Sequence, residues 1–245
     1  MQKIIKALFV LMLSFSFSNA SMVEDGFLEL EKGNVLEAAN IFNVACQKGA
    51  FAGCYNLGLL YFKGEHIAKN YPKAYELFKK ACIEGHNQAC FNLAYMDEKG
   101  LGTQKDLNNA IELYTNACDG GNSSACFNLS AIYEKQNDNF KNVEFLTKAC
   151  NLDHAKACHN LAYKYYNEEG VELAPVKAIT LYEKACDLGY SNACFNLGVA
   201  YVNIGDALQA RECWLKSISI NPKYINPRYN LMRLNSKKMQ YMDIF

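Results

Sequence analysis

A short string that begins with cysteine recurs five times along the chain, and its even spacing constrains the fold more than any other feature. Each copy reads cysteine, an aromatic residue or histidine, asparagine, leucine and a small residue. The copies begin at Cys54, Cys90, Cys126, Cys158 and Cys194. An Ala-Cys pair precedes each copy, and its cysteines are separated by steps of 36, 36, 32 and 36 residues. Periods of this length are typical of helical solenoids, in which helix pairs stack in one direction.

Each period contains two segments whose apolar residues recur at helical spacing. Leu57, Leu60 and Tyr61 follow this spacing in one segment, and Pro72 and Pro175 stand where a second helix would begin. Proline is tolerated in the first turn of a helix because the backbone N–H that it lacks has no partner there. The spacing therefore predicts a pair of amphipathic helices in every repeat.

These observations predict an all-α fold, a right-handed α-solenoid of about six helix-turn-helix repeats with a C-terminal capping helix. We expect the array over residues 21–222, with a first helix at 23–32, and the capping helix and tail over 223–245, starting at about Tyr224. The fourth repeat is shorter than the others, and the residues that it lacks are missing from the linker at 136–139, so its helices are expected to stay intact. In the closing unit Ile218 and Arg228 stand at the positions of the paired cysteines.

The first twenty residues have the pattern of a secretory signal peptide. Lys3 and Lys6 precede an apolar run that ends in small residues before Ala20. The run is shorter than the roughly 20 apolar residues that span a bilayer, and no later stretch is as apolar. We expect residues 1–20 to be removed by cleavage after Ala20, and the protein to be periplasmic or secreted, with no membrane span.

Ten of the eleven cysteines form five pairs with one spacing. In an uninterrupted helix the two cysteines of a pair would lie about 12 Å apart, which exceeds the reach of a disulfide. A residue type that accepts the left-handed conformation follows each first cysteine by three positions, so the chain can reverse between the partners. These residues are Gly49, Gly85, Gly121, Asp153 and Gly189. The predicted disulfides are Cys46–Cys54, Cys82–Cys90, Cys118–Cys126, Cys150–Cys158 and Cys186–Cys194.

The other interpretations of these cysteines are buried free thiols and a metal site. Zinc ligands are usually spaced as Cys-x(2 to 4)-Cys, which the seven-residue gap does not match, and an oxidising compartment favours disulfides over thiols. We therefore expect no metal. Cys213 has no partner at the repeat spacing, and its place before Trp214 on the apolar side of a helix favours a buried free thiol over an intermolecular bridge.

An asparagine follows each second cysteine by two positions, and it is a candidate ligand-binding residue. The asparagines are Asn56, Asn92, Asn128, Asn160 and Asn196, with Asn230 in the closing helix. Asparagine is unfavourable inside a helix because its side chain competes for backbone hydrogen bonds, so something must compensate it in every repeat. Either it bonds to the backbone of a neighbouring repeat, or the stacked amides line the concave face and bind an extended peptide. Lys63, Lys99 and Lys135 would then add a basic track for acidic groups, unless they are merely solvated.

The strings Asn-Leu-Gly/Ala, Tyr and Ala-x-x-x-Tyr/Phe-x-Lys-Ala resemble the Sel1-like repeat, a relative of the tetratricopeptide repeat. With a cysteine pair in each repeat and a signal peptide, the chain is similar to the Helicobacter cysteine-rich protein family. The resemblance implies penicillin binding with weak β-lactamase activity, and a β-lactam or peptidoglycan-like small acid as ligand. The asparagine position also resembles part of the carboxylate clamp of tetratricopeptide co-chaperones, but an aromatic residue or histidine precedes it here where part of that clamp has lysine.

The residues do not supply catalytic parts for such a hydrolase. The chain has no Ser-x-x-Lys, Lys-Thr-Gly or Lys-Ser-Gly string. Its histidines, His66, His86, His154 and His159, form neither His-x-His nor His-Glu-x-x-His. His154 and His159 flank the fourth cysteine pair and are expected to be ordinary residues at a helix start. No glycine-rich phosphate loop is present, so no catalytic residue and no cofactor is predicted.

The charge pattern narrows the kinds of partner. The chain has 25 basic and 25 acidic side chains and no long run of either sign, so bulk charge does not attract nucleic acid. The leading hypothesis is an exported monomeric scaffold that binds a protein or peptide on its concave face. The alternatives are the penicillin-binding, weakly hydrolytic enzyme and a secreted factor that acts on host cells.

Overall fold

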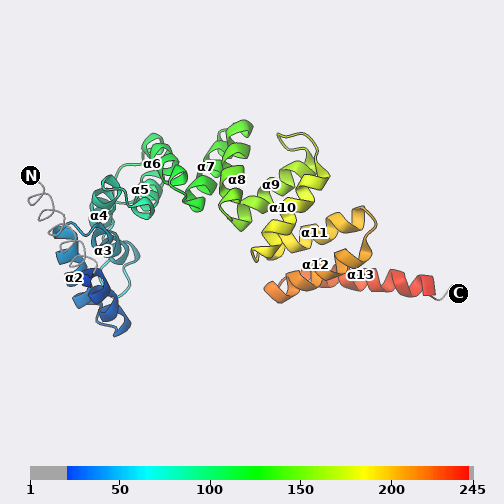
Figure 1. The fold of residues 1–245 in the computed structure, drawn as a ribbon, viewed down its shortest axis with the longest axis horizontal. Coiled ribbons are helices and arrows are strands. Elements are labelled where there is room, and N and C mark those ends of the chain that lie inside the picture. The colour runs from blue at the N-terminus through cyan, green and yellow to red at the C-terminus, as the bar shows by residue number, and fades with distance from the viewer. Residues whose placement is uncertain (1–20, 243–245) are drawn as a thin grey trace, which may run out of the picture. The chain divides into compact units, whose positions relative to one another are not determined.

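The computed structural model describes residues 21–242, and all regular structure in this range is helical. The predicted signal peptide, residues 1–20, lies outside the described residues. The chain divides into two compact units, at residues 1–120 and 121–245 (Figure 1). Within each unit, every helix packs on the next one in chain order, as a solenoid of helix pairs requires. The all-α solenoid fold is therefore confirmed.

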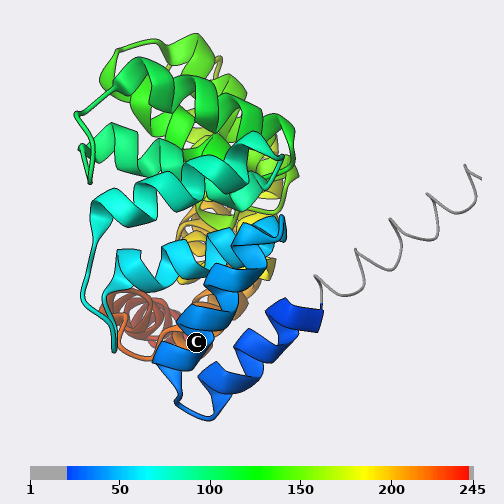
Figure 2. The same ribbon diagram turned by 90° about the vertical axis from the view of Figure 1, so that its left-hand side faces the viewer.

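Unit 1 begins with a helix at residues 21–31, two residues earlier than predicted. Its other helices are α2 (Val35–Gln47), α3 (Phe51–Lys63), α4 (Tyr71–Ile83), α5 (Asn87–Lys99) and α6 (Leu107–Asp119). Figure 2 shows these helices, from blue to cyan and green, stacked in chain order. Pro72 lies in the first turn of α4, as predicted, and the side chain of Asn70 caps that helix by accepting from the backbone N–H of Lys73 at 3.0 Å.

Unit 2 has seven helices among the described residues. They are α7 (Ser123–Lys135), α8 (Asn139–Asn151), α9 (Ala155–Asn167), α10 (Pro175–Asp187), α11 (Ser191–Asn203), α12 (Ala207–Ile220) and α13 (Ile225–Met242). The helices α7 and α8 keep 13 residues each, so the shortened repeat loses only linker residues, as predicted. The last helix begins at Ile225, one residue later than expected.

Sharp corners join the second helix of each repeat to the first helix of the next. The predicted corner residues all have left-handed backbone angles, with φ of +84° at Gly49 and +58° at Asp153. Disulfides close the corners of both units, and the Cα atoms of Cys46 and Cys54 lie 4.6 Å apart, as do those of Cys150 and Cys158. Bridges with Cα separations of 4.6 and 4.7 Å also join Cys82–Cys90 and Cys186–Cys194, and Cys118 of unit 1 and Cys126 of unit 2 are each in a disulfide.

The small residue that ends each repeated string lets the two helices of a repeat approach closely. A Cβ atom at Gly58 would lie 2.7 Å from the ring of Phe78, and one at Gly198 would lie 2.4 Å from Nε1 of Trp214. Phe78 and Trp214 are buried and fill the spaces that these glycines leave. The sequence pattern of a small residue facing an aromatic ring therefore sets the packing distance within a repeat.

Candidate functional site

The first helices of the repeats carry the predicted asparagines, and we call the surface of these helices in each unit the first-helix face. In unit 1 it includes residues 21–31, α3 and α5, and in unit 2 it includes α7, α9, α11 and α13. A cavity lies between neighbouring first helices in each unit, and the predicted asparagine position contributes to both cavities. The first-helix face is therefore where predicted asparagines of the repeated string line cavities.

The larger of these two cavities, which we call the N-terminal groove, has a volume of about 390 Å³ and lies between residues 21–31 and α3. Its walls are mainly apolar, and its polar residues are Asn56, Lys63, Glu65 and His66. The apolar lining residues are Phe27, Leu30, Val35, Phe42, Leu59 and Leu60, with Gly33. Apolar walls with a few convergent polar groups are typical of ligand sites.

The structure brings two predicted residues together in the N-terminal groove. Asn56 and Lys63 lie on the same face of α3, because they are seven residues, or about two turns, apart along the helix axis. Within residues 21–242, the side chain of Asn56 makes no hydrogen bond, and that of Lys63 forms no ion pair. The amide and ammonium groups are therefore available to a ligand that lies along α3.

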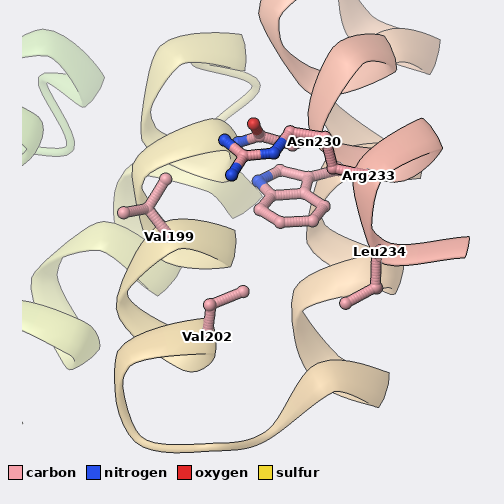
Figure 3. Close-up of a pocket in the computed structure, with 6 residues that line it drawn as sticks. Val199, Val202, Asn230, Arg233 and Leu234 are labelled. Carbon is pink, nitrogen blue, oxygen red and sulfur yellow. The ribbon is translucent and has the colours of Figure 1, made fainter. Parts of the chain in front are cut away.

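The second cavity, of about 180 Å³, lies between α11 and α13 in unit 2 (Figure 3). Val199 and Val202 on α11 face Asn230, Arg233 and Leu234 on α13. Trp214 of α12 also lines the pocket. Asn230 is the closing-helix member of the asparagine series. This pocket repeats the arrangement of the N-terminal groove, with apolar walls, one motif asparagine and one basic side chain.

Between α9 and α11 the amides are used to join neighbouring repeats. The Nδ2 atom of Asn196 lies 3.0 Å from Nε2 of His159, whose Nδ1 atom lies 3.2 Å from Oδ1 of Asn160. Two turns further along α11, Asn203 donates to the hydroxyl of Tyr166 at 2.6 Å. A bond to the backbone of a neighbouring repeat was one of the two alternatives for these asparagines. Asn196 bonds to a side chain of the neighbouring repeat, because His159 places a ring nitrogen opposite the amide.

The same use of the amide occurs in unit 1. Burial raises the pKa of the Tyr55 hydroxyl, and a hydrogen bond with Asn92 partly opposes this effect. Tyr55 precedes Asn56 in its repeat just as His159 precedes Asn160, so in both cases the residue before one asparagine bonds to the amide of the next repeat. Asn128 is also engaged. The predicted asparagine series is thus divided, with Asn56 and Asn230 lining cavities and Asn92, Asn128, Asn160 and Asn196 engaged within the protein.

The three predicted lysines do not share one environment. Lys63 is exposed at the N-terminal groove. Lys99 hydrogen bonds to the neighbouring Glu98, which raises the pKa of Lys99. Lys135 is exposed in the last turn of α7, in unit 2. Glu98 neutralises the charge of Lys99, and Lys63 is the lysine of the three that lines the N-terminal groove. Lys63 is therefore the best placed of them to bind an acidic ligand.

Two histidines have a structural role at helix starts. His86 and His154 are the N-cap residues of α5 and α9, and the Nδ1 atom of each accepts from a backbone N–H at 3.2 Å. Each ring also stacks on an aromatic side chain of the preceding repeat, with 4.5 Å between ring centroids. Burial lowers the pKa of both rings, so the neutral form that can accept the hydrogen bond is favoured. For His154 this is the ordinary role that we expected at a helix start, whereas His159 bridges two repeats.

Sequence reasoning missed the apolar walls of the N-terminal groove. Phe27 remains 46% exposed although its ring contacts that of Phe42 edge to face, and Leu30, on the same helix, lines the same wall. The signal was present in the sequence, because the first helix has no cysteine string and no predicted neighbour on its outer side. It could not be used without knowing which face of this helix turns toward α3.

No group of three or more His, Cys, Asp or Glu side chains in the part of the chain that the structure describes could hold a metal ion. None of the described helices is long and apolar enough to cross a membrane. The thiol of Cys213 is buried and unpaired, and burial raises its pKa to about 11, which keeps it protonated and weakly nucleophilic near neutral pH.

Comparison with protein families identifies the repeats. The Sel1 repeat model matches residues 52–86, 87–122 and 155–190, and a tetratricopeptide repeat model matches residues 191–224. This chain contains Sel1 repeats. The tetratricopeptide match covers α11 and α12, where the second helix has no paired cysteine. A search of curated proteins finds no match.

Solved structures share the Sel1-repeat fold. The protective antigen c5321 of uropathogenic Escherichia coli is 24% identical, with a TM-score of 0.72 over 87% of this chain and 47% of that chain. A Sel1 repeat protein from Oxalobacter formigenes is 21% identical, with a TM-score of 0.71 over 84% of this chain and 86% of that one. Cysteine-rich protein B of Helicobacter pylori is 23% identical over 46% of this chain and 92% of that one, with a TM-score of 0.39. The chain spans less than half of the E. coli antigen, and the likenesses to the E. coli and Oxalobacter structures show the fold alone.

Proposed function

We propose that this protein is an exported scaffold that binds an extended segment of another protein along its first-helix face, with the N-terminal groove as the principal anchoring site. The observation that carries the proposal is the coincidence of an apolar cavity with Asn56 and Lys63, which have no side-chain partner among the described residues. Sel1 and tetratricopeptide repeats are protein-binding scaffolds in general, and their stacked helices offer long binding surfaces.

The chemistry of the groove favours a particular kind of segment. Phe27, Leu30 and Leu59 offer contacts to an aliphatic or aromatic side chain, which would provide most of the binding free energy. The amide of Asn56 can donate to and accept from an extended peptide backbone, and Lys63 with His66 favours a carboxylate beside the apolar anchor. A peptide with a large apolar residue next to an acidic residue fits these groups.

Export to the periplasm or the medium is part of the proposal. The disulfides are consistent with an extracytoplasmic location, since such bonds persist in oxidising compartments and are rare in the cytosol. The sequence of residues 1–20 supports the same location through its basic start and apolar run. Fractionation of cells followed by mass determination of the N-terminus would test both the location and the predicted cut after Ala20.

A peptide selection tests the binding proposal directly. Random peptides displayed on phage would be selected on the purified protein, and the affinity of the enriched peptides measured by calorimetry. Asn56→Ala with Lys63→Ala should weaken binding by about tenfold or more, since each lost hydrogen bond to a charged or amide group contributes about 1 kcal/mol. Thermal stability should be unchanged, because both side chains lack partners among residues 21–242.

Asn196→Ala is the matched control. This substitution removes the hydrogen bond to His159, so it should lower stability and leave the affinity of the selected peptides unchanged. The proposal is wrong if the peptides bind equally well after the Asn56 and Lys63 substitutions, or if repeated selection enriches none.

A further inference from the structure

The last helix of unit 2 has a row of exposed apolar side chains. Ile225, Tyr229 and Met232 are 72%, 60% and 68% exposed, and their spacing of four and three residues places them on one side of α13. A helix face that packs on no other part of the described chain is expected to be polar because it faces water. A contiguous apolar row on such a face is typical of an interaction surface.

The neighbouring repeat shows what this face normally contacts. Asn230 of α13 corresponds to Asn196 of α11, so Ile225, Tyr229 and Met232 correspond to Ser191, Phe195 and Gly198. All three positions of α11 contact its own second helix, α12. Ser191 donates to the backbone oxygen of Ser217 at 3.0 Å, Trp214 donates to that of Phe195 at 3.1 Å, and Gly198 faces the Trp214 ring.

The exposed row therefore lies on the face that a first helix uses to pack against its second helix. No helix of the described residues covers it on α13. At the glycine position, α11 leaves room for the large Trp214 side chain, whereas α13 has Met232. A helix that packs on α13 would consequently need a small residue opposite Met232, rather than the aromatic residue found within the array.

The charges beside the row are all of one sign. Arg228 and Arg233 lie on opposite sides of the row, about 60° and 80° around the helix from Ile225, as the 100° step per residue of an α-helix requires. The guanidinium of Arg233 is 5.8 Å from the centre of the Tyr229 ring. Lys223, which precedes the helix, is also basic, and residues 223–242 contain no Asp or Glu. A partner helix with acidic residues on both sides of its apolar row is complementary to this surface.

We propose that α13 is a docking surface for an acidic amphipathic helix of another protein, which occupies the place of a second helix and completes the last repeat. This interaction is of the helix-in-groove kind, in which an apolar face is buried and flanking charges select the partner. The apolar row lies on a different face of α13 from Asn230 and Leu234, which line the pocket of Figure 3, whereas Arg233 flanks the row and also lines that pocket. The proposal does not depend on the N-terminal groove.

Two designed peptides test the proposal. Both would be labelled 18-residue helices with leucine and alanine in an apolar row, and they would differ only in having Glu or Lys on both sides of that row. Fluorescence anisotropy with the full-length purified protein at low salt should show at least about tenfold tighter binding of the Glu peptide. Arg228→Glu with Arg233→Glu should reverse the preference, and Tyr229→Ser with Met232→Ser should abolish binding of both peptides.

Ile204→Ser with Leu208→Ser provides the matched control, because these residues of unit 2 are 62% and 75% exposed but lie outside the row. This control should bind the Glu peptide normally, and circular dichroism should show that every variant is folded. Equal binding of the two peptides, or a Glu preference that survives the arginine reversal, would refute the proposal. A dimer in light scattering that Met232→Ser dissociates would also refute it, because a second copy would then be the occupant.

Discussion

Adding one methyl group at Gly198 should destabilise unit 2, because the indole of Trp214 occupies the space of a Cβ atom. The added Cβ would lie 2.4, 2.6 and 2.9 Å from Nε1, Cδ1 and Cε2 of Trp214. The indole is 3% exposed and donates to the backbone oxygen of Phe195 at 3.1 Å, so it cannot move without cost. Overpacking costs about 1 to 3 kcal/mol and a strained hydrogen bond about 1 kcal/mol more, whereas replacing a helical glycine by alanine returns up to about 1 kcal/mol. The free energy of unfolding should therefore fall by about 1 to 3 kcal/mol.

A double-mutant cycle isolates this contact. Urea unfolding followed by far-UV circular dichroism would be measured for the parent, Gly198→Ala, Trp214→Leu and the double variant. Trp214 is the only tryptophan, so its fluorescence also reports on this contact in the first two proteins. In the Trp214→Leu background the methyl group has room, and Gly198→Ala should be neutral or stabilising by up to about 1 kcal/mol. An equal loss in both backgrounds would mean that the cost of Gly198→Ala does not arise from the indole.

Three further perturbations test other parts of the structure. Burial lowers the pKa values of His86 and His154 in the folded state, so their contribution to stability is present above the ordinary pKa of about 6.5 and is lost as the pH falls through the folded pKa. The urea midpoint should therefore fall between pH 6.5 and 5. Replacing both histidines by Asn, which keeps the helix cap, should reduce that fall. Burial raises the pKa of the Asp97 carboxyl, so its contribution to stability is present below the ordinary pKa of about 3.9 and is lost as the pH rises through the folded pKa. Asp97→Asn should therefore raise the urea midpoint at pH 7 but not at pH 3. An equal change of the midpoint at the two pH values would contradict this. Replacing Cys186 and Cys194 by Ala should lower the unfolding free energy of unit 2 by about 2.5 kcal/mol, the loop-closure value for so short a loop, and an unchanged urea midpoint would argue against it.

The asparagine series shows why a repeated residue does not have one role. Asn56 and Asn196 occupy the same position in the repeat, but one lines an open cavity and the other bonds to a histidine. What differs is the neighbour in the preceding repeat, which for Asn196 is His159 and for Asn56 is the cysteine-free helix at residues 21–31. Sequence reasoning could identify the six positions but could not assign each one a partner, because the partner lies on another helix.

The sequence by itself determined the helix pairs, the corners and the disulfides. These features are local, since the helical spacing of apolar residues, a left-handed residue three positions after a cysteine and an eight-residue separation all act within one or two turns of chain. The tertiary structure decided which surfaces stay open. The N-terminal groove and the exposed row on α13 arise where a neighbouring helix is displaced or absent among the described residues, and burial at such places depends on packing between helices, which the spacing of residues along one helix does not contain.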